Sequence, residues 1–197
     1  MKPRFSLSFL FFNFSFLISL SSCSEDKEMY PSIVTELVDC PTDAEGQITE
    51  MVFDDDSRLP LTNPVSGLKA NVIYRVLAGY TKTDGKATLY QLKAAALLHD
   101  STTVAQTDPL NVVSLWRTQK YLNLHLLPKT QGGSQTWGFI TDSIVGKRAY
   151  LRLHHRQGTD PTAYSTDVYA SLYLKDIAAD SITLRINTFS GLREWSL

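Results

Sequence analysis

The sequence predicts an all-β protein, and three observations lead to this prediction. Apolar and polar residues alternate at every second position in many short segments, as they do in strands with one buried face. Clusters of Gly, Pro, Asp and Asn separate these segments at intervals of about 8 to 12 residues, the spacing typical of barrels and sandwiches. No long segment carries the apolar stripe of an amphipathic helix. The pattern favours antiparallel sheets that bury one face.

The expected strands fall into two groups along the chain. The first group comprises Ile33–Asp39, Gln47–Phe53, Arg58–Leu61, Asn71–Tyr80 and Lys86–Leu97. The second comprises Val112–Trp116, Tyr121–Leu127, Gln135–Ile140, Arg148–His154, Val168–Leu174 and Ile182–Phe189. The segment Leu98–Pro109 lies about halfway along the mature chain and is the expected domain boundary.

Two turns and one ambiguous stretch complete the secondary-structure prediction. Asp84-Gly85 predicts a hairpin, because Asp tolerates and Gly prefers positive φ. Gln131–Ser134 gives a similar signal between two expected strands. The stretch Ala94–Leu98 is open to two interpretations, a helix or a continuation of the preceding strand.

The first 22 residues are expected to be a cleaved lipoprotein signal peptide. A short basic start precedes the apolar run Phe5–Leu20, which as a helix would span about 24 Å, less than the hydrocarbon core of a membrane. The run ends in Leu20-Ser21-Ser22-Cys23, which resembles a bacterial lipobox and predicts lipidation of Cys23. The alternative is a retained membrane anchor. Two or more acyl chains on Cys23 would hold the folded part stably at the membrane.

An acidic linker is expected at residues 23–30, directly after the lipidation site. Its residues Ser24, Glu25 and Asp26 resemble the surface-export signal of Bacteroidota lipoproteins, which predicts a lipid-anchored outer-membrane protein exposed at the cell surface. The alternatives are a solvated linker start and display at the periplasmic face.

The charge and cysteine content exclude several classes of protein. Without Lys2 and Arg4 of the signal, 17 Lys and Arg stand against 20 Asp and Glu, a formal charge of −3 that argues against a nucleic-acid binder. Two Cys are too few for a disulfide scaffold or a Cys-based zinc module. Cys40 is then the remaining thiol, expected to be a buried apolar residue beside Val38 rather than a reactive or intermolecular one.

Several segments of the second half carry a resemblance to a known family through their order and spacing. They are Asn111–Trp116, Tyr121–Leu124, Leu153–His155, Asp160–Ser165 and Tyr169–Ser171. Together with the lipobox, they resemble the NigD-like lipoproteins over almost the whole mature chain. The resemblance implies a small OB-type barrel at residues 31–98, a linker at 99–108 and an antiparallel β-sandwich at 109–197. It implies no catalytic residues, because the family is known by its association with a bacteriocin locus and not by a molecular activity.

The sequence offers weak candidates for a metal or catalytic site. Asp54-Asp55-Asp56 could supply carboxylates to calcium, but no EF-hand spacing follows, so a solvated turn is favoured. The adjacent His154 and His155 point to opposite faces of a strand, which disfavours a shared metal. The chain contains no G-x-S-x-G, H-E-x-x-H or phosphate-loop motif. We therefore expect no enzyme, no cofactor and no metal.

Aromatic residues give the best candidate for a binding site. In Tyr121–Leu127 the leucines share one face, while Tyr121, Asn123 and His125 share the other. Tyr169 and Tyr173 also lie opposite the apolar face of their strand and are expected to be partly exposed. Tyr121, Tyr169 and Tyr173 thus form a possible binding face for a protein or a glycan. The alternative is that the tyrosines only cover a sheet, with Trp116 and Trp137 in the core.

The sequence favours a non-catalytic binding or interaction module on the outer membrane. One alternative is an envelope hydrolase with a site at the domain interface, built from His125, His154 and an Asp. A second alternative is a structural subunit of a surface assembly, which would present exposed edge strands.

Overall fold

A computed structural model describes residues 32–101 and 107–197 of the chain. The predicted signal peptide, Cys23 and the acidic residues Ser24, Glu25 and Asp26 lie outside the described residues, as do residues 102–106 of the predicted linker. Within the described part, no helix is long and apolar enough to cross a membrane. Strands make up nearly all of the regular structure, which confirms the all-β prediction.

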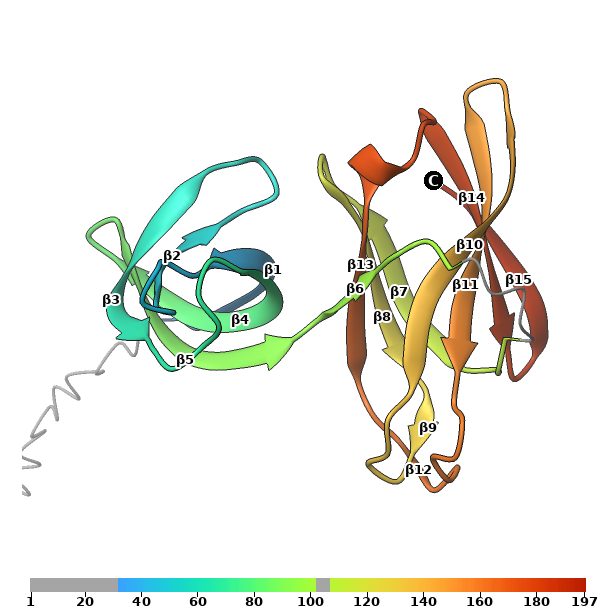
Figure 1. Cartoon of the computed structure of the whole chain (residues 1–197), viewed down its shortest axis with the longest axis horizontal. Helices are drawn as coiled ribbons and strands as arrows, with labels where there is room; N and C mark the ends of the chain where they lie inside the picture. The colour runs from blue at the N-terminus through green and yellow to red at the C-terminus, as the bar shows by residue number, and fades with distance from the viewer. Residues whose placement is uncertain (1–31, 102–106) are drawn as a thin grey trace, which may run out of the picture. The chain divides into compact units, whose positions relative to one another are not determined.

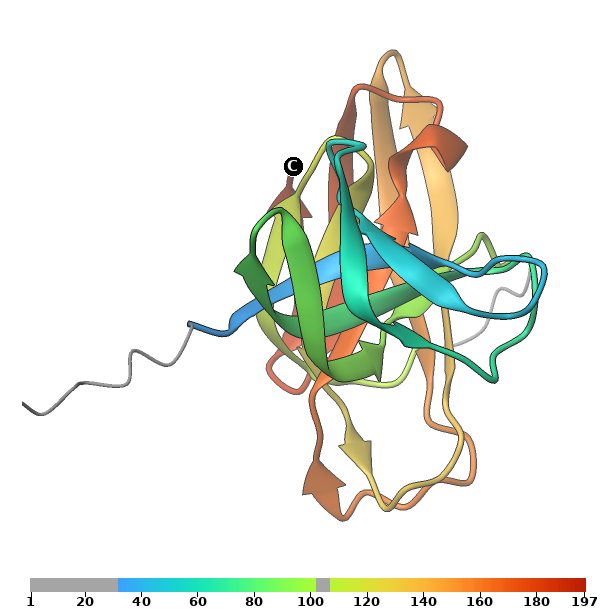
Figure 2. The ribbon, with the colours of Figure 1, turned by 90° about the vertical axis from the view of Figure 1, so that its left-hand side faces the viewer.

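Five strands in the first half close into a barrel, as the predicted OB type requires (Figure 1). Figure 2 turns these strands, drawn in blue to green, toward the viewer. Hydrogen bonding joins them in the order β1-β2-β3-β5-β4. Their bounds are β1 (Val34–Pro41), β2 (Ile48–Val52), β3 (Arg58–Val65), β4 (Ile73–Thr83) and β5 (Lys86–Ala94).

The interior of the barrel is filled by apolar side chains that alternate along its strands. Val38, Met51 and Ala78 are each 0% exposed. Cys40 belongs to this core and is also fully buried, which confirms the expectation that it is an apolar core residue.

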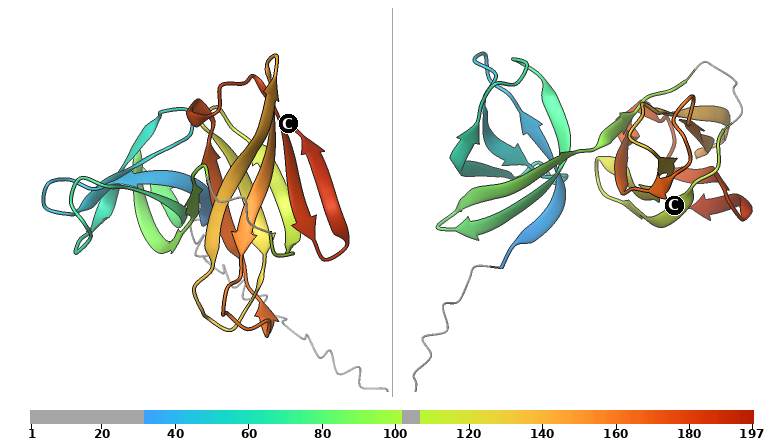
Figure 3. Two further views of the ribbon diagram at one scale, coloured as in Figure 1. Left: turned by 45° about the vertical axis from the view of Figure 1, so that its right-hand side comes forward. Right: turned by 90° about the horizontal axis from the view of Figure 1, so that it is seen from below.

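Two four-stranded sheets form the sandwich of the second half (Figure 3). One sheet has the order β6-β13-β8-β7 and the other β10-β11-β14-β15. The strands of the first sheet are β6 (Ala96–Leu98), β7 (Asn111–Arg117), β8 (Tyr121–Leu127) and β13 (Val168–Tyr173). Those of the second are β10 (Thr136–Val145), β11 (Arg148–Arg156), β14 (Ser181–Thr188) and β15 (Gly191–Ser196).

The sandwich core lies between the inner faces of the two sheets. Leu122, Leu124 and Leu126 of β8 are fully buried there, on the face that the alternation predicts. Residues from the opposite sheet, including Phe139 and Leu151, complete the same cluster. A two-stranded ribbon of β9 (Lys129–Thr130) and β12 (Tyr164–Ser165) and the 3-10 helix η1 (Leu174–Asp176) lie outside the two sheets.

The stretch Ala94–Leu98 shows where the predicted domain limits and the observed pairing differ. The predicted strand Lys86–Leu97 divides into β5 and β6, and β6 pairs with β13 of the sandwich in parallel. Ala96–Leu98, assigned from the sequence to the first domain, therefore belongs to a sheet of the second. The stretch forms a strand and not a helix, because an extended conformation lets Leu98 join the sandwich core.

The two predicted turns have different outcomes. Asp84 and Gly85 adopt φ of 51° and 72° between β4 and β5, which confirms the hairpin. Gln131–Ser134 instead connects β9 to β10, and β8 and β10 belong to different sheets. Asp160 holds this turn, because its carboxylate accepts hydrogen bonds from the backbone N–H of Gln131 at 2.9 Å and of Gly133 at 3.0 Å.

Most pairs among the described strands are antiparallel, as the alternation favours, but three are parallel. The pairs β3 with β5, β6 with β13 and β11 with β14 are parallel, whereas the remaining pairs are antiparallel. These parallel pairs join strands that are not consecutive in the chain, and no local alternation pattern specifies which distant strands meet.

Candidate binding cleft

A buried arginine on the barrel lies at the centre of a polar network. Arg75 on β4 is 4% exposed, and its Nη1 donates to Asp39 at 3.1 Å and to Asp54 at 2.7 Å. Its Nη2 donates to Asp54 and to Asn123, each at 3.1 Å. Its Nε donates to Ser171 at 3.2 Å. Since Asn123 and Ser171 belong to the sandwich, one side chain joins both domains of the unit Pro31–Leu197.

Tyr121 belongs to this network and not to an open surface. It is 6% exposed, its hydroxyl donates to Asp39 at 3.1 Å, and Arg75 lies 4.0 Å above the centre of its ring. Burial and the nearby Asp39 carboxylate raise the pKa of Tyr121, so the hydroxyl stays protonated and continues to donate. The outer face of β8 is therefore buried at Tyr121 and Asn123.

The orientation of the Asn123 amide follows from its partners. Arg75 can only donate, so the atom that faces it is Oδ1, which also accepts from Ser171 at 2.6 Å. The Nδ2 group then points away from the network. It is fully buried and has no hydrogen-bond partner in the described part of the chain. Buried donors without partners are rare, and the residue that carries this one lines a cavity.

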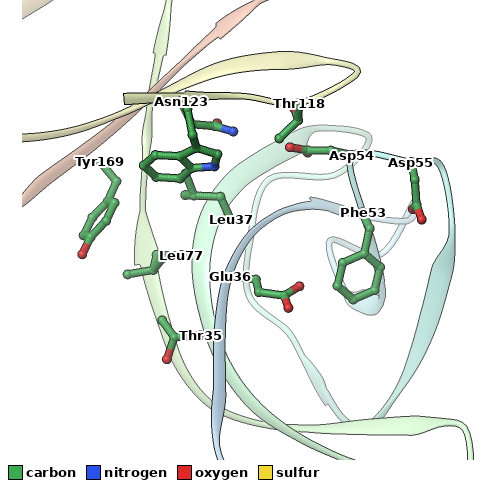
Figure 4. Close-up of a pocket in the computed structure, with 11 residues that line it drawn as sticks. Thr35, Glu36, Leu37, Phe53, Asp54, Asp55, Leu77, Thr118, Asn123 and Tyr169 are labelled. Atoms are coloured by element: carbon green, nitrogen blue, oxygen red, sulfur yellow. The ribbon is translucent and has the colours of Figure 1, made fainter. Parts of the chain in front are cut away.

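The cavity, here called the cleft, has a volume of about 600 Å³. Figure 4 shows its lining, with Asn123 and Thr118 from the sandwich segment and Glu36, Leu37 and Phe53 from the barrel. Apolar or aromatic groups make up about half of that lining. They are Leu37, Phe53, Leu77, Trp116 and Tyr169, whereas the polar members are Thr35, Glu36, Asp54, Asp55, Thr118 and Asn123.

The cleft runs along one edge of β1. Successive side chains of a strand point to opposite faces, yet Thr35, Glu36 and Leu37 all line the cleft. Three consecutive residues can line one cavity when it reaches around an edge of the strand. The pairing agrees, because β1 pairs along its whole length with β4 but with β2 only at Asp39 opposite Val52.

Acidic groups give the barrel side of the cleft its charge. The Asp54 carboxylate is paired with Arg75, whereas Glu36 and Asp55 are exposed. Hydrogen bonds from Ser57 lower the pKa of Asp55, so this carboxylate stays charged at neutral pH. Glu36 lies beside the Tyr80 hydroxyl, 3.5 Å from it, and burial together with this carboxylate raises the pKa of Tyr80. The cleft therefore combines an apolar wall with an anionic rim.

The predicted tyrosine face is only partly brought to this cleft. Tyr169 lines it and stacks on His125, with 4.4 Å between the ring centres. Tyr173 is half-buried and packs against Tyr121 at 5.3 Å. Tyr169 and Tyr173 are partly exposed, as expected, whereas Tyr121 is buried. Tyr121 lies beneath the barrel's polar residues, because Asp39 and Arg75 cover the outer side of β8.

The histidines of the hydrolase alternative lie in separate environments. His125 contacts Asp167, with 2.6 Å between Nε2 and Oδ1. His154 is 4% exposed on β11, and its Nδ1 has no partner among the described residues. His155 is buried. Its ring stacks on Trp137 with 4.4 Å between the ring centres, and its Nε2 lies 2.8 Å from Oε1 of Gln135. In residues 32–101 and 107–197, no hydrogen bond or ion pair joins His125 to His154.

The three consecutive aspartates separate in the structure. Asp54 pairs with Arg75, Asp55 accepts the backbone N–H of Ser57 at 2.9 Å, and Asp56 forms an ion pair of 2.5 Å with Lys120. Asp55 and Asp56 are exposed turn residues, as the turn interpretation expects, whereas Asp54 is partly buried. In the described part of the chain, no group of three His, Cys, Asp or Glu side chains is placed to hold a metal.

Sequence reasoning missed the residues that build the cleft. Arg75 and Asp39 each interrupt an apolar strand with a charge, and a charged residue within an apolar strand is itself a signal, because such a group is rarely buried without a partner. Trp116, expected as a possible core residue, is 36% exposed and lines the cleft. No sequence pattern indicated that Glu36 and Phe53 would lie beside it.

A five-stranded barrel followed by a two-sheet sandwich, with a cleft lined by both, defines a two-domain all-β protein. Residues 95–196 match the model of the NigD-like C-terminal beta sandwich domain. The chain therefore belongs to the NigD-like family. A comparison with curated proteins found no match.

Solved structures share the fold over most of the chain. A NigD-like immunity protein from Bacteroides caccae aligns with a TM-score of 0.65 and 23% identity, over 84% of this chain and 93% of that one. A protein from Parabacteroides distasonis, proposed to be toxin-related, aligns with a TM-score of 0.65 and 14% identity, over 84% of this chain and 92% of that one. A Bacteroides fragilis protein, proposed to be a lipoprotein, aligns with a TM-score of 0.58 and 12% identity, over 84% of this chain and 96% of that one.

Proposed function

We propose that the protein is a lipid-anchored, non-catalytic binding protein of the outer membrane, and that the cleft takes its partner, a protein or a glycan. The observation that carries this proposal is the cleft itself. Its volume of about 600 Å³ lies in the range of ligand sites, and it combines an apolar wall with a few polar groups. One of its lining residues, Asn123, carries a buried donor, Nδ2, without a hydrogen-bond partner among the described residues.

The names of the solved neighbours support a role in binding. One is called an immunity protein and another is proposed to be toxin-related. None of the neighbours described above carries the name of an enzyme. The separate environments of His125 and His154 give no support to the hydrolase alternative.

The cleft replaces the tyrosine face as the proposed contact surface. Trp116 and Tyr169 supply aromatic area on its sandwich side, and such residues contribute much of the energy of interfaces. Partner capture on living cells tests this assignment. Chemical crosslinking of intact cells should yield an adduct with the wild-type chain and with Ile144→Ala, which truncates an exposed apolar residue outside the cleft.

The cleft variant Trp116→Ala should lose most of that adduct, while its melting temperature stays close to that of the wild type. Equal adduct yields from Trp116→Ala and Ile144→Ala would overturn the assignment of the cleft. Recovery of the wild-type chain alone at saturating crosslinker would overturn the binding role.

The proposed anchor is a lipid on Cys23. One solved neighbour, the Bacteroides fragilis protein, is itself proposed to be a lipoprotein, which supports this anchor. Metabolic labelling with a fatty-acid analogue should mark the wild-type chain, and Cys23→Ser should remove both the label and retention in the membrane fraction. Persistent membrane retention of an unlabelled chain would contradict lipid anchoring.

Surface exposure is proposed to depend on the acidic residues after the anchor. Protease added to intact cells should digest the wild-type chain, whereas a Glu25→Ala and Asp26→Ala double variant should become protected. Unchanged digestion of this variant would show that these residues are not the export signal.

A further inference from the structure

The edge of β1 beside the cleft is open to another strand. β1 pairs with β4 along Val34–Pro41, but on its other side it meets β2 only at Asp39. Among the described strands, none pairs with Val34–Val38 on that side. An unpaired edge offers N–H and C=O groups to an extended polypeptide, which adds to the sheet as a further strand.

The two sides of this edge differ in chemistry. Glu36 lies on the side of Phe53, while Leu37 lies on the side of Leu77. A strand added here would also point its side chains alternately to these two sides. Every second side chain of the added strand would face the carboxylates, and the side chains between them would face the apolar wall.

Charge on the open edge selects for a cation. Glu36 and Asp55 form no ion pair with any described Lys or Arg, whereas Asp54 is already paired with Arg75. Opposite charges placed across neighbouring strands attract, and like charges repel. An incoming Lys or Arg beside Glu36 therefore fits this edge, and a carboxylate does not.

An independent observation on the opposite wall also points to a polypeptide. Asn123 is 0% exposed and lines the cleft, and its Nδ2 has no hydrogen-bond partner in the described chain. The bonds from Arg75 and Ser171 fix the amide, so this donor cannot turn back into the network. A backbone carbonyl is the acceptor that every residue of a polypeptide supplies.

We propose, as a deepening of the proposed function on which it rests, that the cleft binds an extended polypeptide segment in which Lys or Arg alternates with apolar residues. The segment adds to the open edge of β1. Its basic side chains face Glu36, its apolar side chains pack on Leu37 and Trp116, and a carbonyl accepts from Asn123.

Synthetic peptides test this proposal directly on the full chain. The probe is an acetylated and amidated peptide of alternating Lys and Val, as long as the eight residues of β1. Calorimetry should detect its binding, while the matched peptide of alternating Glu and Val should not bind. Glu36→Gln should weaken the affinity about two- to five-fold, as expected for one cross-strand charge pair, and the remote control Glu45→Gln should leave it unchanged.

Backbone methylation distinguishes strand addition from simple charge attraction. In an added edge strand, alternate N–H groups face β1 and the others face away. N-methylation of one alternate set of residues should abolish binding, whereas methylation of the other set should preserve it. Equal effects of the two sets, or equal binding of the Glu and Lys peptides, would overturn the proposal.

Failure of this proposal can be told apart from failure of the proposed function. If neither peptide binds but the cellular adduct still depends on Trp116, the cleft is a binding site for a different ligand and the extended basic segment is refuted. If the adduct does not depend on Trp116, the assignment of the cleft is refuted as well.

Discussion

Arg75 on the barrel donates a hydrogen bond to Asn123 on the sandwich, with 3.1 Å between Nη2 and Oδ1. The two residues are 48 positions apart in the chain. The bond fixes both the guanidinium, which also holds Asp39 and Asp54, and the amide that lines the cleft. The packing that joins the domains therefore also shapes the candidate site.

Removal of the Arg75 guanidinium should strongly destabilise the chain. Arg75→Met leaves Asp39 and Asp54 without their cation and removes one of the two donors to Asn123 Oδ1, the other being Ser171. Breaking a buried ion pair from one side costs about 3–5 kcal/mol. Urea unfolding followed by tryptophan fluorescence measures the change in the free energy of unfolding.

The matched control is Arg58→Met, which removes an exposed ion pair with Glu50 on the barrel surface. It should change stability little, because exposed pairs contribute about 0–1 kcal/mol. A similar loss in both variants would contradict the central role of Arg75.

Stability should decrease as the pH falls below neutral because of His155. Burial lowers the pKa of this imidazole, so the unfolded chain takes up the proton first as the pH falls below its ordinary value of about 6.5. This contribution to stability is complete above about pH 7 and decreases as the pH falls below about 6.5, with a slope of at most about 1.4 kcal/mol per pH unit. Urea midpoints measured at successive pH values below 7 give the slope.

His155→Gln should flatten that slope, whereas His99→Gln, at an exposed site, should not. Asp160 affects the stability of the chain in a separate and lower pH range. Hydrogen bonds from Thr130 and Gln131 hold its pKa at about 2, so its contribution is present above about pH 4 and is lost below it. An unchanged slope in His155→Gln would show that another group titrates.

Cys40 should not react with thiol reagents in the folded chain. Burial in the barrel core raises its pKa to about 12, so almost no thiolate is present at neutral pH. Ellman's reagent added to a Cys23→Ser chain should release colour only after unfolding in urea. Rapid reaction of the folded chain would contradict this burial.

Gly46 should tolerate a methyl group less well than Gly67. Both have positive φ, of 75° and 83°, but a Cβ on Gly46 would lie 2.2 Å from the carbonyl oxygen of Leu68. The Cβ of Gly67→Ala meets nothing within 4 Å. We expect Gly67→Ala to cost about 1–2 kcal/mol from backbone strain and Gly46→Ala to cost about 1–3 kcal/mol more.

Thermal unfolding of the two alanine variants measures that difference. Equal melting temperatures would show that the backbone at Leu68 moves aside without cost.

Local pattern was sufficient to predict most strands. In β8 the alternation of leucines with Tyr121, Asn123 and His125 located both the strand and its core face, because burial on one side requires a period of two. The same rule missed β15. Five of its six residues, including Leu192, are exposed, so its apolar and polar residues do not alternate. The rule also left Ala94–Leu98 open between helix and strand, because the pairing of β6 with β13 depends on residues far along the chain.

The cleft could not be predicted from such patterns. Glu36, Asp55 and Trp116 come from three different segments, and only the packing of the barrel on the sandwich brings them to one cavity. Tyr121 shows the same limit, since its strand pattern gives its face but not the barrel residues that cover it.

Site-specific photocrosslinking on intact cells tests most directly whether the cleft is the binding site. A photoreactive amino acid at Thr35, on the open edge of β1, should form an adduct with the partner in high yield. The same group at Ser143, an exposed residue on β10 outside the cleft, should form little or none. Adducts of equal yield at both positions, or an adduct only at Ser143, would contradict the account.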